Sequence, residues 1–423
     1  MGHDADTGMN RRRHAPWLLV ACGALFVFLA LPWPIVASGD AVAQVPRQEQ
    51  AKSPAPAPDE LRLGEMGLDL ESERYVAPMG PGRAVLTMVP KIQERVEKLL
   101  ADYRVPWAAA VLLEPATGRV LAMAEHAQRE PGSRGLSLQA RAPAASVFKI
   151  VTSAALLQRG FEPDAEVCYH GGRHRLQRNN LADDPRRDRS CLSLASALGH
   201  SANVVFAKLA DRALNAELLR TSAASLLFNT SIPFPQAVEM SRADIPEDPF
   251  ALATTAAGFG PVRLSPLHGA LLAAIVANGG VFVPPDVLAS VEGAVAPPRA
   301  ESRRVLDERV ALSLATMMRT TVTEGTARQF FRGRRNRHSP LESLTVAGKT
   351  GSLSEASPFR DYSWFVGFAP VDRPQVAFAV VVMNDRAWRV KAPYVAREAL
   401  SAWAEWEWGR LQASAAAPAS FAR

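Results

Sequence analysis

The stretch Ala144-Ala145-Ser146-Val147-Phe148-Lys149 places a hydroxyl and an amine three positions apart at the start of an apolar run. Residues 150–158 of that run suit a helix, which Gly160 ends. Because residues three apart share a helix face, the Lys149 amine can reach the Ser146 hydroxyl. A lysine whose pKa is lowered by burial or by a neighbouring cation can take the proton of a hydroxyl. The spacing therefore predicts Ser146 as a nucleophile and Lys149 as its base.

A second motif, Ser201-Ala202-Asn203, follows the helical region around the first one and precedes another apolar helical run. In a turn between helices, the hydroxyl of Ser201 can relay a proton and the amide of Asn203 can hold a peptide backbone in the same cleft. The alternative interpretation is a helix N-cap, since serine often accepts a hydrogen bond at a helix start.

The third motif is Lys349-Thr350-Gly351-Ser352, led by the strand-like residues 344–347. A glycine in a strand lets another backbone approach closely, and the flanking amine and hydroxyls suit a carboxylate. The chain has only seven lysines, so a lysine in each of two motifs is informative. We expect Thr350, Gly351 and Ser352, with Lys349 beside them, to bind a carboxylate of the substrate.

The pattern of the remaining chain indicates an α/β (α+β) fold. Residues 91–103 and 394–411 suit helices, and apolar runs of helical length dominate residues 144–318. Residues 107–113 and 118–124 suggest a hairpin, while residues 363–369 and 376–383 are strand-like. Strands at both ends of a large helical region predict a mixed antiparallel sheet flanked by helices, with a large all-α insertion.

The N-terminal region carries Arg11, Arg12 and Arg13 before an uncharged apolar segment. Basic residues ahead of such a segment stay in the cytoplasm, and the following chain is exported. An uncleaved membrane anchor and a removed signal peptide both fit. The expected organisation is a cytoplasmic N-terminus (residues 1–16), the anchor or signal (17–38), a Pro/Ala-rich linker and lead-in (39–74), the catalytic domain (75–411) and a flexible tail (412–423).

Export places Cys168 and Cys191 in an oxidising compartment, where a pair can close a disulfide. The residues between them form a loop rich in Arg, Asn and Asp. A bridge across it would contribute about 3 kcal/mol by restricting the unfolded chain. Two unpaired structural thiols are the alternative.

Composition narrows the function classes. Of the 423 residues 48% are hydrophobic and 21% charged, which fits a globular protein and excludes a multi-span transporter. The net charge of +6 is spread along the chain, so no nucleic-acid partner is expected. The histidines lack metal-ligand spacing. Gly348-Lys349-Thr350 is not a phosphate loop, because Ser343 stands where the first glycine of that loop belongs.

The three motifs occur once each, in this order, on a helix, a turn and a strand. In this the chain resembles the penicillin-binding proteins, namely the transpeptidase domain of the high-molecular-weight, class B-like type. The resemblance covers residues 75–411, and further segments carry it: residues 85–93, 114–124, 258–260, 265–267, 277–280, 324–326 and 364–370.

The resemblance implies a serine β-lactamase/penicillin-binding transpeptidase-like fold and an acyl-enzyme mechanism. Ser146 would attack the carbonyl between the two terminal D-alanines of a peptidoglycan stem peptide, with Lys149 as base. Ser201, helped by Lys349, would pass the proton to the leaving amine, and Asn203 would hydrogen-bond the bound peptide.

By the same resemblance, Thr350 and Ser352 would hold the terminal carboxylate, and the N–H groups of Ser146 and Ser352 would form the oxyanion hole. An amine from a neighbouring stem would then take the acyl group and close a cross-link. β-Lactams should acylate Ser146, and neither a metal nor an organic cofactor is needed. Cell-wall synthesis proteins are a further class of partner.

The sequence also departs from this family, since we expect only a linker and a lead-in where high-molecular-weight members carry a large N-terminal module. The chain is expected at the inner membrane, single-pass, with its catalytic domain in the periplasm, or in the periplasm after signal cleavage. D,D-carboxypeptidase or endopeptidase activity is the alternative function. A β-lactamase and a non-catalytic penicillin sensor are less favoured, the former because Asn203 stands where related lactamases typically have valine.

Overall fold

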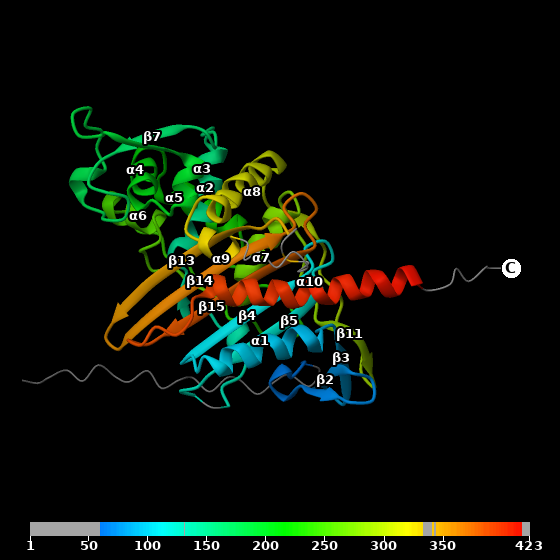
Figure 1. Ribbon diagram of the computed structural model, residues 1–423. Coiled ribbons are helices and arrows are strands. Elements are labelled where there is room, and N and C mark those ends of the chain that lie inside the picture. Colours follow the sequence, from blue (N-terminus) through cyan, green and yellow to red (C-terminus); the bar gives the residue numbers. More distant parts are fainter. Residues whose placement is uncertain (1–59, 131, 333–340, 342–343, 417–423) are drawn as a thin grey trace, which may run out of the picture. The chain divides into compact units, whose positions relative to one another are not determined.

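A five-stranded antiparallel sheet lies at the centre of the fold, and its strands come from both ends of the chain. The order is β13 (Ala347–Ala356), β14 (Phe359–Ala369), β15 (Val376–Asn384), β4 (Trp107–Leu113) and β5 (Val120–His126). Figure 1, a view of the computed structural model, shows the orange C-terminal strands beside the cyan N-terminal pair. All four pairings in this sheet are antiparallel, which confirms the predicted antiparallel sheet built from strands of both ends of the chain.

The structure describes residues 60–130, 132–332, 341 and 344–416, all within one unit that spans residues 55–423. The helices are α1 (Pro90–Asp102), α2 (Lys149–Gln158), α3 (Leu194–Gly199), α4 (Asn203–Ala213), α5 (Ala216–Ser225), α6 (Pro249–Ala256), α7 (Pro266–Ala277), α8 (Glu308–Thr323), α9 (Arg328–Phe331) and α10 (Ala392–Ala416). Short 3-10 turns are η1 (Leu63–Glu65), η2 (Leu136–Leu138), η3 (Ala145–Phe148) and η4 (Arg178–Asn180).

Both faces of the central sheet are buried, and two of its inner strands, β4 and β15, are apolar at every position except Asn384. Along β15, Val380 and Val382 pack into the core under α1 and α10, whereas Ala379 and Val381 pack into the core around α7. Successive side chains of a strand point to opposite faces, so a continuous apolar strand serves two cores. Figure 1 shows α1 and α10 crossing one face of the sheet.

A second, four-stranded sheet has the order β1 (Gly67–Asp69), β2 (Arg74–Met79), β3 (Gly82–Leu86) and β11 (Leu288–Glu292). Ordered structure therefore begins before Tyr75, inside the predicted lead-in. The buried side chains of Leu61 and Leu63 belong to the main core, and Leu61 pairs with Met79. Burial of these two side chains holds residues 61–63 against the domain, although the composition of the segment predicted only a lead-in.

The predicted all-α insertion is wrong in detail, because short strands interrupt the helices. The paired strands are β6 (Ala142–Pro143) with β9 (Arg263–Leu264), β7 (Glu166–Tyr169) with β8 (Ser190–Ser193), and β10 (Val281–Phe282) with β12 (Arg303–Arg304). Each is two to four residues long and depends on a partner distant in sequence, so no local periodicity indicates it.

The strand that carries the third motif begins later than predicted. Residues 344–346 precede β13, which starts at Ala347 opposite Phe368 of β14. In this register residue 345 would face Pro370, which has no N–H to donate to a strand ladder. The strand instead continues to Ala356, where it pairs with Phe359.

Several predicted segments lie outside the described residues: the N-terminus (1–16), the anchor or signal (17–38), the linker as far as residue 59, and the last residues of the tail. Helix α10 continues to Ala416, past the expected domain end at residue 411. Within the part of the chain that is described, no helix is both long and apolar enough to cross a bilayer.

Candidate active site

The three motifs meet at one cleft. Ser146 lies in η3 directly before α2, Ser201 lies in the turn between α3 and α4, and Lys349 lies on β13. The Lys149 Nζ atom is 2.9 Å from Ser146 Oγ and 2.8 Å from Asn203 Oδ1. The Lys349 Nζ atom is 3.0 Å from Ser201 Oγ. The structure thus brings together motif residues that are as many as 206 positions apart, since Ser146 and Ser352 both line this cleft.

Lys149 is fully buried and lies among three acceptors. Its amine donates to Ser146 Oγ, to Asn203 Oδ1 and, over 2.5 Å, to the carbonyl of Ala257. Burial first, and then the nearby positive charge of Lys349, hold the pKa of Lys149 well below its usual value. A neutral amine has a free lone pair, so Lys149 can accept the proton of Ser146 as that hydroxyl attacks.

The backbone around Ser146 is held in an unusual conformation. Ala145 has a φ of 49°, in the left-handed region that costs energy for a residue with a Cβ. Gly258, with a φ of 95°, packs so closely that an added Cβ would lie 2.5 Å from the Ala145 carbonyl oxygen. A glycine is therefore required at position 258, and its backbone supports the turn that presents the Ser146 hydroxyl.

A second amine and hydroxyl pair lies across the cleft. Lys349 is fully buried, and its amine donates to Ser201 Oγ and, over 2.8 Å, to the Thr350 carbonyl. Burial lowers the pKa of Lys349 to about 7. Ser201 has a φ of 54°, so its position in the turn is strained as well. An amine that titrates near neutral pH, bonded to a hydroxyl, can pass a proton in either direction.

Asn203 is the first residue of α4 and has both ends of its amide occupied. Its Oδ1 accepts from Lys149, and its Nδ2 donates over 2.9 Å to the main-chain carbonyl of His174. The amide thus orients the base. The hydrogen bond to a bound peptide that we expect of Asn203 stays a prediction.

Strand β13 is an edge strand of the central sheet, and no other strand among the described residues pairs with its outer edge. Such an edge can pair with an extended peptide. Thr350 and Ser352 line the cleft, and the Thr350 hydroxyl lies 2.6 Å from that of Thr326. At Gly351 an added Cβ would lie 3.2 Å from Val147 Cγ2, so the glycine permits β13 to pack against the segment of Ser146. The carboxylate-binding and oxyanion roles remain predictions.

The cleft has a volume of about 420 Å³, and some of the residues that line it were not predicted as functional. These additional lining residues are His174, Phe259, Thr326, Gln329, Phe330, Ser363, Trp364, Lys391 and Pro393. His174 is notable because burial, and then the charges of Lys149 and Arg173, lower its pKa. Its only sequence signal is its place in the segment between the two cysteines.

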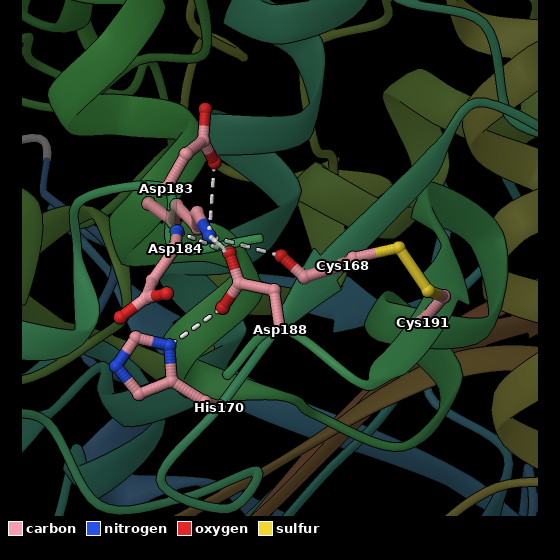
Figure 2. The surroundings of a disulfide bond; sticks show 7 residues. Cys168, His170, Asp183, Asp184, Asp188 and Cys191 are labelled. Carbon is pink, nitrogen blue, oxygen red and sulfur yellow. Dashed lines mark hydrogen bonds and ion pairs between the residues drawn. A yellow bond between two sulfur atoms is a disulfide. The ribbon is translucent and has the colours of Figure 1, made fainter. Parts of the chain in front are cut away.

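The two cysteines form the disulfide that export suggested. Cys168 in β7 lies opposite Cys191 in β8, and the two are bonded. Figure 2 shows the bridge beside a group of acidic side chains and His170. Among the described residues no group of histidine, cysteine and acidic side chains is arranged to hold a metal ion.

Comparison with known proteins points to one family. The family described as "Penicillin binding protein transpeptidase domain" matches residues 108–401, which is more than half of the chain. The peptidoglycan D,D-transpeptidase PbpA of Mycobacterium tuberculosis is 28% identical over 348 residues, covering 72% of this chain and 67% of that protein. PbpA of Mycolicibacterium smegmatis is 27% identical, covering 65% and 61%. The chain thus spans roughly two thirds of the length of these relatives.

Solved structures give the same result. An imipenem acyl-enzyme complex of penicillin-binding protein A from M. tuberculosis superposes with a TM-score of 0.60 at 25% identity, covering 77% of this chain and 80% of that one. A D,D-transpeptidase domain from Eggerthella lenta reaches 0.63 at 24% identity, with 77% and 83% covered, and shows the shared fold. With its matching fold and family signature, this chain belongs to the penicillin-binding protein transpeptidase domain family.

Proposed function

We propose that this chain is a peptidoglycan D,D-transpeptidase that works through an acyl-enzyme on Ser146. The observation that carries the proposal is the buried amine of Lys149, 2.9 Å from Ser146 Oγ, with its pKa well below the usual value. Ser146 is thus a nucleophile whose neighbouring base, the Lys149 amine, can be neutral and accept its proton. The M. tuberculosis relative that carries the name D,D-transpeptidase supports the same assignment.

The reaction begins when Ser146 Oγ bonds to the carbonyl carbon of a D-alanyl-D-alanine donor. Its proton moves to Lys149 Nζ, and the former carbonyl oxygen becomes an oxyanion. The C–N bond then breaks. Lys349 supplies a proton, which passes through the Ser201 hydroxyl to the departing D-alanine nitrogen. This leaves an ester on Ser146.

The ester is resolved when an amine of a second stem peptide attacks the same carbonyl carbon. The amine loses a proton through Ser201 to Lys349, which the first half-reaction left neutral. The C–O bond to Ser146 breaks, Ser146 Oγ regains the proton held by Lys149, and the new amide is the cross-link. An extended donor fits beside the free edge of β13. The strained four-membered amide of a β-lactam presents a carbonyl in the same place, so it should acylate Ser146.

We further propose that the domain acts outside the cytoplasm, at or near the membrane. The Cys168–Cys191 disulfide supports this, since such bonds persist in oxidising compartments. The charged and apolar N-terminal segment supports export but leaves anchor and cleaved signal open. Cell-wall synthesis proteins would be the partners that recruit the domain to its substrate.

The test is to incubate the purified domain with a labelled penicillin and follow its intact mass over hours. We expect a stable adduct in the wild-type protein and none in Ser146→Ala. Fast loss of the adduct with drug turnover would indicate a β-lactamase, and the lack of any adduct would refute the proposal. In cell walls of a deletion strain, fewer cross-linked dimers indicate a transpeptidase, whereas more pentapeptide indicates a carboxypeptidase.

A further inference from the structure

The segment between the two cysteines, which we call the cysteine loop (residues 169–190), packs on α4 at two separate places. At the first residue of α4, the Asn203 amide donates to the His174 carbonyl, and the Val204 N–H donates over 3.2 Å to the Arg173 carbonyl. The loop therefore supplies the carbonyl that orients the same amide that bonds Lys149.

The second contact is a buried ion pair five residues further along α4. The side chain of Lys208 is fully buried, and its amine lies 2.5 Å from Asp188 Oδ2 and 3.0 Å from the carbonyl of Cys168. At 1.5 Å per residue this contact lies about 7.5 Å along the helix from Asn203. Lys208 thus holds the loop near both of its ends, at Asp188 and at the carbonyl of Cys168.

Asp188 is the centre of a larger network. Its other carboxylate oxygen lies 2.5 Å from His170 Nδ1, while the Asp184 N–H donates to Oδ2. Figure 2 shows Asp188 between His170 and the main chain of Cys168. Burial opposes ionisation of Asp188, but the hydrogen bonds from Lys208, the Asp184 amide and His170 outweigh it and hold the pKa below its usual value.

A buried ion pair is a poor source of stability, because taking two charges out of water offsets most of their attraction. Its better-attested use is to fix one arrangement among several. Here the side chains of Lys208 and Asp188 are 0% and 7% exposed. The remaining acidic partner of α4 in the loop, Asp183, pairs with both Lys208 and Arg212, but its side chain is 63% exposed and that of Arg212 is 48% exposed. The buried pair is thus the contact that constrains where the loop lies.

We propose that Lys208 and Asp188 are positioning residues for acylation: by holding the cysteine loop on α4 they set the His174 carbonyl, and through it Asn203 and the catalytic base. The inference rests on the proposed function. Catalytic geometry is sensitive to such support, since a displacement of about 1 Å can lower a rate by about 100-fold. Neither residue touches the cleft itself, as the residues that line it show.

The test compares three variants. Lys208→Met/Asp188→Leu removes both charges together, so no unpaired charge is left buried, and Asp188→Asn keeps the shape while removing one charge. Arg212→Gln, the matched control, breaks the exposed ion pair of Arg212 with Asp183, which joins the same helix and the same loop, and leaves Lys208 and Asp188 in place. Each variant is measured for melting temperature, for the fraction of active sites titrated, and for the acylation rate with a chromogenic β-lactam from about pH 5 to about pH 9.

We expect the double variant to acylate about 10-fold more slowly per active site, with a smaller loss for Asp188→Asn and none for Arg212→Gln. A loosened loop admits water to Lys149, which weakens the effect of burial and raises the pKa of this amine. The acidic limb of the rate profile should therefore move to higher pH. The charged or titratable groups facing that amine are Lys349 from β13 and His174 from the loop. A purely structural role would reduce the amount of active protein but leave the limb in place.

The outcomes separate the two proposals. If wild-type protein is acylated and the folded double variant matches it in rate and profile, the positioning role is wrong and the proposed function stands. If the double variant does not fold, Asp188→Asn decides by the same two measurements. If the wild-type protein itself forms no adduct, both proposals fall.

Discussion

The buried amine of Lys349 predicts how the stability of this protein depends on pH. Replacing it by methionine, Lys349→Met, keeps a long unbranched side chain and removes the titrating group. In the folded protein, burial lowers the pKa of this lysine from 10.5 to about 7. The unfolded chain exposes the lysine to water and returns it to the higher value.

The sign follows from which state holds the proton. Between about pH 7 and about pH 10.5 the unfolded chain keeps a proton that the folded protein has released, so the free energy of unfolding rises with pH across this window. Below about pH 7 both states carry the proton and the contribution is constant. Integrating from about pH 7 to about pH 9.5 gives a gain of about 3 kcal/mol for the wild-type protein.

Urea unfolding at several pH values, with the disulfide intact, measures this contribution. The difference between wild type and Lys349→Met should change by about 3 kcal/mol over that range, whatever constant offset the lost hydrogen bond to Ser201 adds. Lys98→Met removes a lysine whose side chain is 76% exposed, so its unfolding curve should keep the wild-type pH dependence. A parallel pH dependence in wild type and Lys349→Met would show that the lysine is charged in the fold and refute the reasoning.

Three further predictions concern other contacts of the cleft and the loop. Asn203→Ala removes an acceptor from Lys149 and should slow acylation by about 10- to 100-fold in stopped-flow measurements, so an unchanged rate would count against it. Cys168→Ser/Cys191→Ser opens a bridge with a sequence separation of 23 and should lower the free energy of unfolding in urea by about 3 kcal/mol, whereas a stability equal to wild type would contradict the loop-closure argument. Gly351→Ala places a Cβ 3.1 to 3.3 Å from three neighbouring atoms and should cost about 1–3 kcal/mol in thermal unfolding while lowering the acylation rate; a fully stable, fully active variant would show that β13 can shift freely.

The sequence predicted the elements whose signals are local. Helix α1 repeats its buried residues Ile92, Val96 and Leu100 every four positions, so its period alone predicts a helix. Strands β4 and β15 are continuous apolar runs that end at turn residues, and both were expected. The three motifs were predicted as one site because they occur together, once each and in order, and so resemble those of the penicillin-binding proteins. Only the spacing between Ser146 and Lys149 is a local signal.

What the sequence could not predict depends on contacts between distant segments. The short strands β7 and β8 exist because residues on either side of the cysteine loop pair with each other, and no local pattern marks them. Strand β13 begins at Ala347 because Pro370, more than twenty residues later, ends its partner.

From the sequence alone, the spacing of Ser146 and Lys149 predicted a hydroxyl with an amine base, because a hydroxyl and an amine one helical turn apart are a local arrangement. The class of reaction followed from the resemblance of the three motifs to those of the penicillin-binding proteins. Only the tertiary structure decided that Lys349 bonds Ser201, that Asn203 is oriented by the His174 carbonyl, and that Lys208 and Asp188 hold the loop in place. These relations depend on burial, which removes water and changes both the charge of an amine and the cost of leaving it unpaired. Burial is a property of the packed chain, and no single segment carries it.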